Sequence, residues 1–127
     1  MSPKGIDLAK MRLYREQSGQ CAYSQKPIDL NRLCEVGYVE IDHALPYSRS
    51  FDNSFTNKVL VLTAENRNKG NRTPYEYLGG ANNDQAWLTY QAWVQATIKN
   101  PRKVQKLLRK DFDENKAQEF RDRNLND

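Results

Sequence analysis

Residues 37–70 constrain the fold of this chain most, because two strand patterns, a polar loop and a helix pattern follow one another there. Residues 38–43 alternate between hydrophobic and polar side chains, which predicts a strand with one buried face. Residues 59–62, Val-Leu-Val-Leu, predict a buried strand. Thr63 can cap a helix that ends near Gly70. We therefore expect two strands joined by a loop and followed by a short helix.

Helices are expected on both sides of this stretch. The spacing of apolar residues, or a capping box with proline at the first helical position, predicts helices at residues 6–17, 73–79, 87–98 and 101–112. Residues 20–33 are rich in turn formers and predict at most a small hairpin and one helical turn. The charged tail, residues 113–127, has a weaker helical pattern. The fold class predicted from these patterns is α+β.

Composition limits the classes of protein to which the chain can belong. A length of 127 residues with 38% hydrophobic content fits one domain with a modest core. The formal charge of +4 permits nucleic-acid binding without requiring it. No apolar run approaches the roughly 18 residues that span a bilayer, so no membrane function is expected. Two cysteines and no apolar leader favour a reduced, cytoplasmic protein.

The polar residues of the central stretch suit metal-assisted hydrolysis of a phosphodiester. Mg²⁺ prefers oxygen ligands and keeps several waters, so the Asp42 carboxylate and the Asn66 amide oxygen are enough protein ligands. His43 is the only histidine. Imidazole suits transition metals better than Mg²⁺, and it ordinarily titrates near neutral pH, so His43 is a better candidate for a general base.

This site makes one demand on the local geometry. Neighbouring residues on a regular strand point to opposite faces, so Asp42 and His43 cannot both reach one point from within a strand. The two side chains could converge if His43 is the last strand residue and the backbone turns before Pro46. We therefore expect the strand to end at His43 and the His43 side chain to turn back toward the Asp42 side, as a mechanism in which both residues act at one point requires.

The same stretch resembles the HNH, or ββα-metal, nuclease motif. More closely, it resembles the HNH domain of type II CRISPR RNA-guided DNA endonucleases, in particular the compact type II-C branch. The resemblance is carried by residues 38–46, 55–62, 65–71, 73–77 and 123–127. Because it covers nearly the whole chain, it implies that residues 1–127 are a single HNH endonuclease domain, excised from a larger multidomain nuclease. Helices would then surround a ββα-metal core.

The resemblance also implies roles for individual residues. His43 would be the general base of a one-metal mechanism, and Asp42 and Asn66 would bind Mg²⁺, for which Mn²⁺ can substitute. Asn57 would orient His43 through hydrogen bonding. The domain would cut the DNA strand that pairs with the guide RNA, in the bacterial cytoplasm and together with the remaining domains of the parent nuclease. A phage anti-CRISPR inhibitor protein is a further expected partner.

Two features around the site have competing explanations. Lys69, Lys58 and Arg67 are candidates for contacts with DNA phosphates, although a solvated surface position is the favoured alternative for Lys58 and Arg67. Many HNH nucleases carry a structural zinc held by two Cys-x-x-Cys pairs. The two thiols here, Cys21 and Cys34, cannot form a four-ligand site, so no structural zinc is predicted.

Two other functions remain open at this point. The chain could be a free-standing HNH nuclease that binds its own duplex, in which case it should bind a specific target alone. It could also be a non-catalytic interaction module with a vestigial site. The intact set of Asp42, His43 and Asn66 argues against the second possibility.

Overall fold

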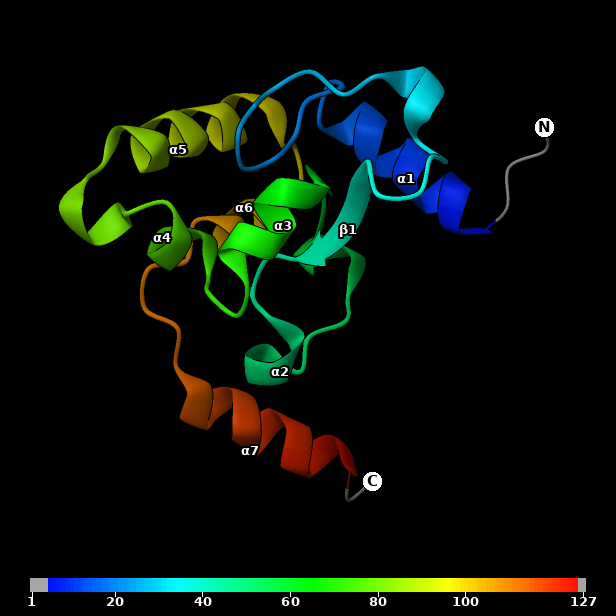
Figure 1. Cartoon of the computed structure of the whole chain (residues 1–127). Coiled ribbons are helices and arrows are strands. Elements are labelled where there is room, and N and C mark those ends of the chain that lie inside the picture. Colours follow the sequence, from blue (N-terminus) through cyan, green and yellow to red (C-terminus); the bar gives the residue numbers. More distant parts are fainter. Residues whose placement is uncertain (1–4, 126–127) are drawn as a thin grey trace.

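The computed structural model describes residues 5–125 and shows a small two-stranded sheet surrounded by short helices (Figure 1). The α-helices are α1 (Gly5–Glu16), α2 (Tyr47–Ser50), α3 (Thr63–Lys69), α4 (Pro74–Tyr77), α5 (Gln85–Thr97), α6 (Pro101–Leu107) and α7 (Glu114–Leu125). The 3₁₀ turns are η1 (Leu30–Arg32), η2 (Phe55–Asn57) and η3 (Gly80–Asn82), and the strands are β1 (Val39–His43) and β2 (Lys58–Leu62). The predicted α+β class is confirmed.

The sheet is an antiparallel pair in which β2 lies deeper than β1. Val39 pairs with Leu62 and His43 pairs with Lys58, so the register covers both strands from end to end. The three central residues of β2 are fully buried, whereas β1 has one buried residue, Val39, and is half-buried beyond it. The alternation along residues 38–43 therefore overstated the burial of Ile41, because the end of β1 approaches the surface.

A glutamine completes the other edge of β2. Gln17, just after α1, accepts the Leu60 N–H at 2.8 Å and donates to the Leu60 carbonyl at 2.8 Å. The side chain is fully buried and makes the contacts that the backbone of a third strand would make. This pair of hydrogen bonds attaches α1 to the sheet.

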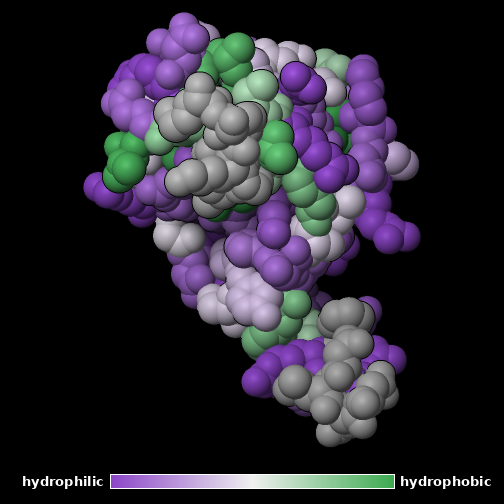
Figure 2. Space-filling model, turned by 90° about the vertical axis from the view of Figure 1, so that its right-hand side faces the viewer, coloured by the Kyte–Doolittle hydropathy of each residue, from purple (hydrophilic) through white to green (hydrophobic). Residues whose placement is uncertain are grey.

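The hydrophobic core lies between the sheet and helices α1, α5 and α6. Trp87, Tyr90 and Val94 face inward from α5, and Leu13 of α1 and Leu107 of α6 pack into the same cluster. The helical spacing of these residues predicted this face. The side of the molecule in Figure 2 is mostly hydrophilic, with hydrophobic side chains in small separate areas. Within the described residues, no helix is long and apolar enough to cross a membrane.

Two segments differ from the sequence prediction. The helix expected over 101–112 ends at Leu107. Phe112 lies instead against Arg49, whose guanidinium is 5.4 Å from the centre of the Phe112 ring. The polar loop expected between the two strands contains two short helical turns, α2 and η2. The C-terminal helix α7 packs on α2, where Glu114 forms an ion pair with Arg49 at 2.7 Å (Figure 1).

The other short segments follow the prediction. Thr73 accepts the Glu76 N–H at 3.2 Å and the Glu76 carboxylate accepts the Thr73 N–H at 2.8 Å, which is the predicted capping box. Residues 20–33 form a bridge between Gln20 and Pro27 followed by η1, as expected.

Candidate active site

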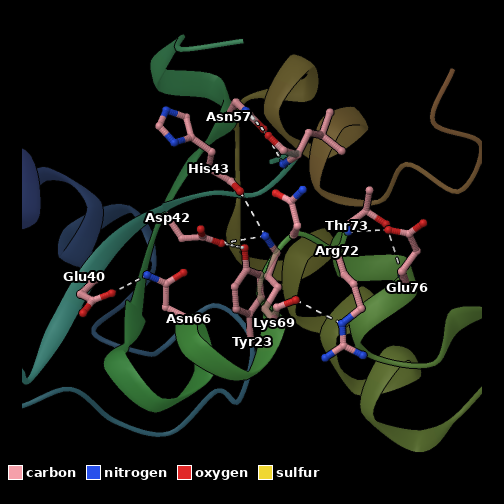
Figure 3. A network of polar contacts seen from close by, with 12 residues as sticks. Tyr23, Glu40, Asp42, His43, Asn57, Asn66, Lys69, Arg72, Thr73 and Glu76 are labelled. Carbon is pink, nitrogen blue, oxygen red and sulfur yellow. Dashed lines mark hydrogen bonds and ion pairs between the residues drawn. The ribbon is translucent and has the colours of Figure 1, made fainter. Parts of the chain in front are cut away.

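The proposed site lies where the end of β1 meets α3 and the loop that follows the strand. His43 is the last residue of β1, as the sequence reasoning required. However, the side chains of Asp42 and His43 still follow the alternation of a strand. In Figure 3 the Asp42 carboxylate points toward Lys69 and Tyr23, while the His43 ring points away from them. The expected convergence of the two side chains is therefore not present in this structure.

Asp42 is held by two donors that come from distant parts of the chain. The Tyr23 hydroxyl donates to Asp42 Oδ2 at 2.6 Å, and the Lys69 ammonium lies 2.9 Å from the same oxygen. The Asp42 side chain is only 13% exposed. Burial, followed by the nearby Asp42 charge, raises the pKa of Tyr23 well above its usual value, so Tyr23 remains a hydrogen-bond donor.

Lys69 is an internal cation rather than a surface residue. Its residue exposure is 1%, and its ammonium also donates to the His43 carbonyl at 3.1 Å. Burial lowers the pKa of Lys69 below its usual value, although the Asp42 charge acts in the opposite direction. The expected contact of Lys69 with a DNA phosphate is therefore wrong for this structure, because burial and pairing with Asp42 occupy the ammonium. Its positive charge instead fixes the Asp42 carboxylate and the end of β1.

Asn66 lies on α3, beside the face of β1 that carries Asp42 and Glu40 (Figure 3). Its amide nitrogen donates to the Glu40 carboxylate, which leaves the carbonyl oxygen as the Asn66 atom that a cation could bind. Glu40 is two positions before Asp42 on β1 and therefore shares its face. The structure shows that Glu40 sets the orientation of the Asn66 amide.

The donor atoms of this site fit a hard cation. Asp42, Asn66 and Glu40 present carboxylate and amide oxygens, which are the ligands that Mg²⁺ or Mn²⁺ prefers. Among the described residues, no group of three or more His, Cys, Asp or Glu side chains is placed to hold a metal. A cation here would therefore need the Asn66 oxygen together with water or substrate oxygens, a ligand set that is ordinary for Mg²⁺.

The His43 imidazole is held by residues of the loop that follows it. Its Nε2 lies 2.8 Å from Asn53 Oδ1, and its ring centre lies 5.6 Å from that of Tyr47, at an interplanar angle of 45°. Lys58 is the cross-strand partner of His43, so both side chains leave the sheet on the same face. Lys58 is half-buried, and Arg67 is exposed on α3. Their contacts with DNA stay predictions.

Asn57 supports His43 in a different way from the one expected. Its Oδ1 accepts the Leu45 N–H, and its Nδ2 donates to the carbonyls of Leu45 and Asp52, each at 2.9 Å. The expected hydrogen bond from Asn57 to the His43 ring is therefore wrong, because this fully buried amide is occupied by backbone groups. Asn57 instead closes the loop that carries Tyr47 and Asn53.

The sequence did not indicate which residues hold the Asp42 carboxylate and the His43 imidazole. Tyr23 was placed in a turn with no assigned chemistry, and Asn53 was one polar residue in a polar loop. Tyr47 directly follows Pro46 and is half exposed. An aromatic residue close to the only histidine was the one available signal. The contact between Tyr23 and Asp42 joins residues 19 positions apart, and no local pattern predicts it.

The two cysteines occupy different environments. Cys21 is buried in the core, where its Sγ accepts the Leu62 N–H at 3.4 Å, and Cys34 is exposed. The absence of a structural zinc stays a prediction.

Comparison with known proteins identifies similar sequences. The family described as HNH endonuclease matches residues 21–75, a region that contains Asp42, His43 and Asn66. The CRISPR-associated endonuclease Cas9 of Campylobacter jejuni is 44% identical over 101 residues, which cover 79% of this chain and 10% of that protein. The protein of the same name from Staphylococcus aureus is 40% identical over 98 residues, 76% of this chain and 9% of that protein. The chain thus spans about a tenth of the length of these relatives.

Solved structures show the same arrangement. Streptococcus thermophilus Cas9 in complex with the AGAA PAM matches with a TM-score of 0.72 at 34% identity, over 83% of this chain and 11% of that chain. The type II-C Cas9 enzyme from Actinomyces naeslundii matches with a TM-score of 0.63 over 84% of this chain and 12% of that chain. Its 17% identity supports the fold alone.

Proposed function

Because the chain belongs to the HNH endonuclease family, we propose that it is the domain of a CRISPR RNA-guided nuclease that hydrolyses the DNA strand paired with the guide RNA. The observation that carries this proposal is the position of Asp42, His43 and Asn66 within the matched family region. They lie on the adjoining elements β1 and α3. The proposal treats residues 1–127 as a single domain of a larger protein.

Asp42 and Asn66 are the proposed ligands of one Mg²⁺ ion, for which Mn²⁺ can substitute. Bound there, the cation would neutralise charge on the scissile phosphate and stabilise the leaving oxygen. Tyr23 and Lys69 hold the Asp42 carboxylate in place, and Glu40 holds the Asn66 amide. These contacts keep the oxygen atoms positioned before the substrate arrives, which lowers the cost of reorganisation.

His43 is the proposed general base that takes a proton from the attacking water. In-line displacement at phosphorus places the attacking and leaving oxygens on opposite sides of the phosphate. The base and the oxygen ligands therefore need not converge on one point. A phosphate at the end of β1 could face the imidazole on one side and the Asp42 side on the other, which agrees with the alternation of these two residues.

The proposed substrate is the target DNA strand within the RNA–DNA heteroduplex. Base pairing with the guide supplies the sequence specificity, and the protein supplies position and chemistry. The remaining domains of the parent nuclease would bring the heteroduplex to Asp42 and His43, so the isolated chain is expected to cut weakly or not at all. A cytoplasmic bacterial location, the type II-C branch and an inhibitor partner stay predictions.

Strand-resolved cleavage by the parent nuclease tests the role of His43. With a matched guide, His43→Ala should abolish cutting of the guide-paired strand and leave DNA binding nearly unchanged. Asn31→Ala, at an exposed residue of η1, is a control that should cut normally. Continued cutting of the guide-paired strand by His43→Ala would remove His43 from its role.

Metal titration tests the proposed ligands separately from the base. Asp42→Ala and Asn66→Ala should require more Mg²⁺ for cleavage or should be inactive at any concentration, because each loses one oxygen ligand. Direct Mn²⁺ binding to the chain should weaken in both variants and persist in His43→Ala. An unchanged Mg²⁺ requirement in either variant would exclude that residue as a ligand.

A further inference from the structure

The structure offers an assignment for the atom of His43 that acts as the base. His43 Nε2 lies 2.8 Å from Asn53 Oδ1, and an amide oxygen can only accept a hydrogen bond. The proton of the neutral ring is therefore on Nε2, and the lone pair of Nδ1 is left for another group. We propose that Asn53 is a positioning residue that holds His43 in this tautomer, and that His43 Nδ1 is the atom that receives the proton of the water. This inference rests on the proposed function.

Asn53 can perform this task because its neighbours in the loop are anchored. Asp52 forms an ion pair with Lys106 of α6 at 2.8 Å, and its Oδ1 accepts the Ser54 N–H at 2.9 Å. The Lys106 ammonium also donates to Ser54 Oγ at 2.9 Å. In addition, Asn57 donates to the carbonyl of Asp52. Both residues that flank Asn53 are thus attached to other elements, so its amide has a defined position although its side chain is exposed.

A second contact restrains the face of the same ring. Tyr47 lies against His43 with ring centres 5.6 Å apart, and Phe51 lies against Tyr47 at 6.4 Å in an edge-on arrangement. The Arg121 guanidinium lies 5.0 Å from the centre of the Phe51 ring. Tyr47 thus restricts rotation of the imidazole while Asn53 bonds one edge of it. Together they leave the Nδ1 edge for the substrate.

This assignment has a chemical consequence. A neutral imidazole exchanges between two tautomers, and only the tautomer with a lone pair toward the water can take its proton. An acceptor at position 53 selects one of them in the same way that an acidic or carbonyl partner orients other catalytic histidines. Removing the acceptor should slow the chemical step and leave substrate binding unchanged.

The first test is spectroscopic and does not depend on activity. His43 is the only histidine, so a chain labelled with ¹⁵N-histidine contains a single imidazole and two ring nitrogens to assign. The ¹⁵N chemical shifts of the neutral ring in the wild type should show a protonated Nε2 and an unprotonated Nδ1. Asn53→Asp retains an acceptor oxygen and should preserve these shifts, whereas Asn53→Leu should move both ring nitrogens toward the shifts of a mixture of the two tautomers. A wild-type proton on Nδ1 would overturn the assignment.

The second test measures cleavage by the parent nuclease at saturating substrate. Asn53→Leu should cut the guide-paired strand about 10–100-fold more slowly with unchanged substrate affinity, which is the usual loss when a partner that orients a histidine is removed. Asn53→Asp should remain within several-fold of the wild type. Matched urea midpoints of the two variants should show that both are folded.

The outcomes separate this inference from the proposed function. If His43→Ala abolishes cleavage while Asn53→Leu cuts at the wild-type rate, the role of Asn53 is refuted and the proposed function stands. If His43→Ala still cuts the guide-paired strand, the proposed function fails, and the spectrum alone decides whether Asn53 sets the tautomer.

Discussion

Replacing Asn57 by alanine tests whether this residue holds the loop that carries Tyr47 and Asn53. Asn57 is fully buried, and its amide makes one hydrogen bond to the Leu45 N–H and two more to the carbonyls of Leu45 and Asp52. Asn57→Ala removes all three partners at once. The two Leu45 backbone groups left behind are buried, so they cannot regain their hydrogen bonds without local opening of the loop.

The expected magnitude follows from the number of bonds lost. Taking about 1 kcal/mol for each of three hydrogen bonds gives a loss of about 3 kcal/mol in the free energy of unfolding. Single domains have about 5–15 kcal/mol in total, so the variant should still fold. Asn57→Asp is not a conservative change here. It keeps an acceptor for Leu45 N–H but turns a carboxylate oxygen toward two carbonyl oxygens, so it should also be destabilised.

Urea denaturation of the chain measures this effect. At the m-values of small domains, a loss of about 3 kcal/mol shifts the midpoint by about 1 M or more without changing the slope. Asn31→Ala removes an exposed amide from η1 and should stay within about 0.5 kcal/mol of the wild type. A loss of less than about 1 kcal/mol for Asn57→Ala, or wild-type stability for Asn57→Asp, would show that the Asn57 amide does not hold this loop.

Two further stability predictions concern charged pairs. Lys103→Met leaves the Glu16 carboxylate, 24% exposed, without its buried partner, and should lower the free energy of unfolding by about 3 kcal/mol. The double variant Lys103→Met/Glu16→Leu should recover most of this loss when both are measured by urea denaturation. An equally unstable double variant would contradict that expectation. The hydrogen bond from Arg49 lowers the pKa of the Glu76 carboxyl group. The stabilisation that this pair gives to the fold is therefore present above the unfolded pKa of about 4.3 and is lost as pH falls through the lower folded pKa. Glu76→Gln keeps an acceptor for the capping box and should be less stable than the wild type at pH 7, by a difference that shrinks as the pH falls below about 4. A difference that does not change with pH would count against this pair.

Periodicity and capping predicted the elements around the site because these signals are local. The alternation of residues 38–43, the apolar run 59–62 and the cap at Thr73 each depend on neighbours within a few positions. The same local rule of strand alternation describes Asp42 and His43, which lie on opposite faces of β1, and the convergence expected from a turn at His43 was wrong. The helix expected to reach residue 112 ends at Leu107, and Phe112 packs against a distant group, the Arg49 guanidinium.

The partners of the polar side chains could not be predicted in the same way. The Lys69 ammonium can bind a phosphate or a carboxylate, and the Asn57 amide can bond an imidazole or a backbone group. The chemistry of these groups allows each choice. Which one occurs depends on the path of the loop after β1 and on which groups that path buries.

Local sequence patterns were therefore enough to predict the strand, loop, strand and helix, together with the Asp42, His43 and Asn66 side chains that they carry. The pairing of Asp42 with Lys69 and Tyr23, and of His43 with Asn53, depends on the completed fold. The physical reason is that backbone elements follow from short-range periodicity. A buried polar group, in contrast, must bond whichever partner the completed fold brings within reach, since leaving it unpaired costs more than any local preference.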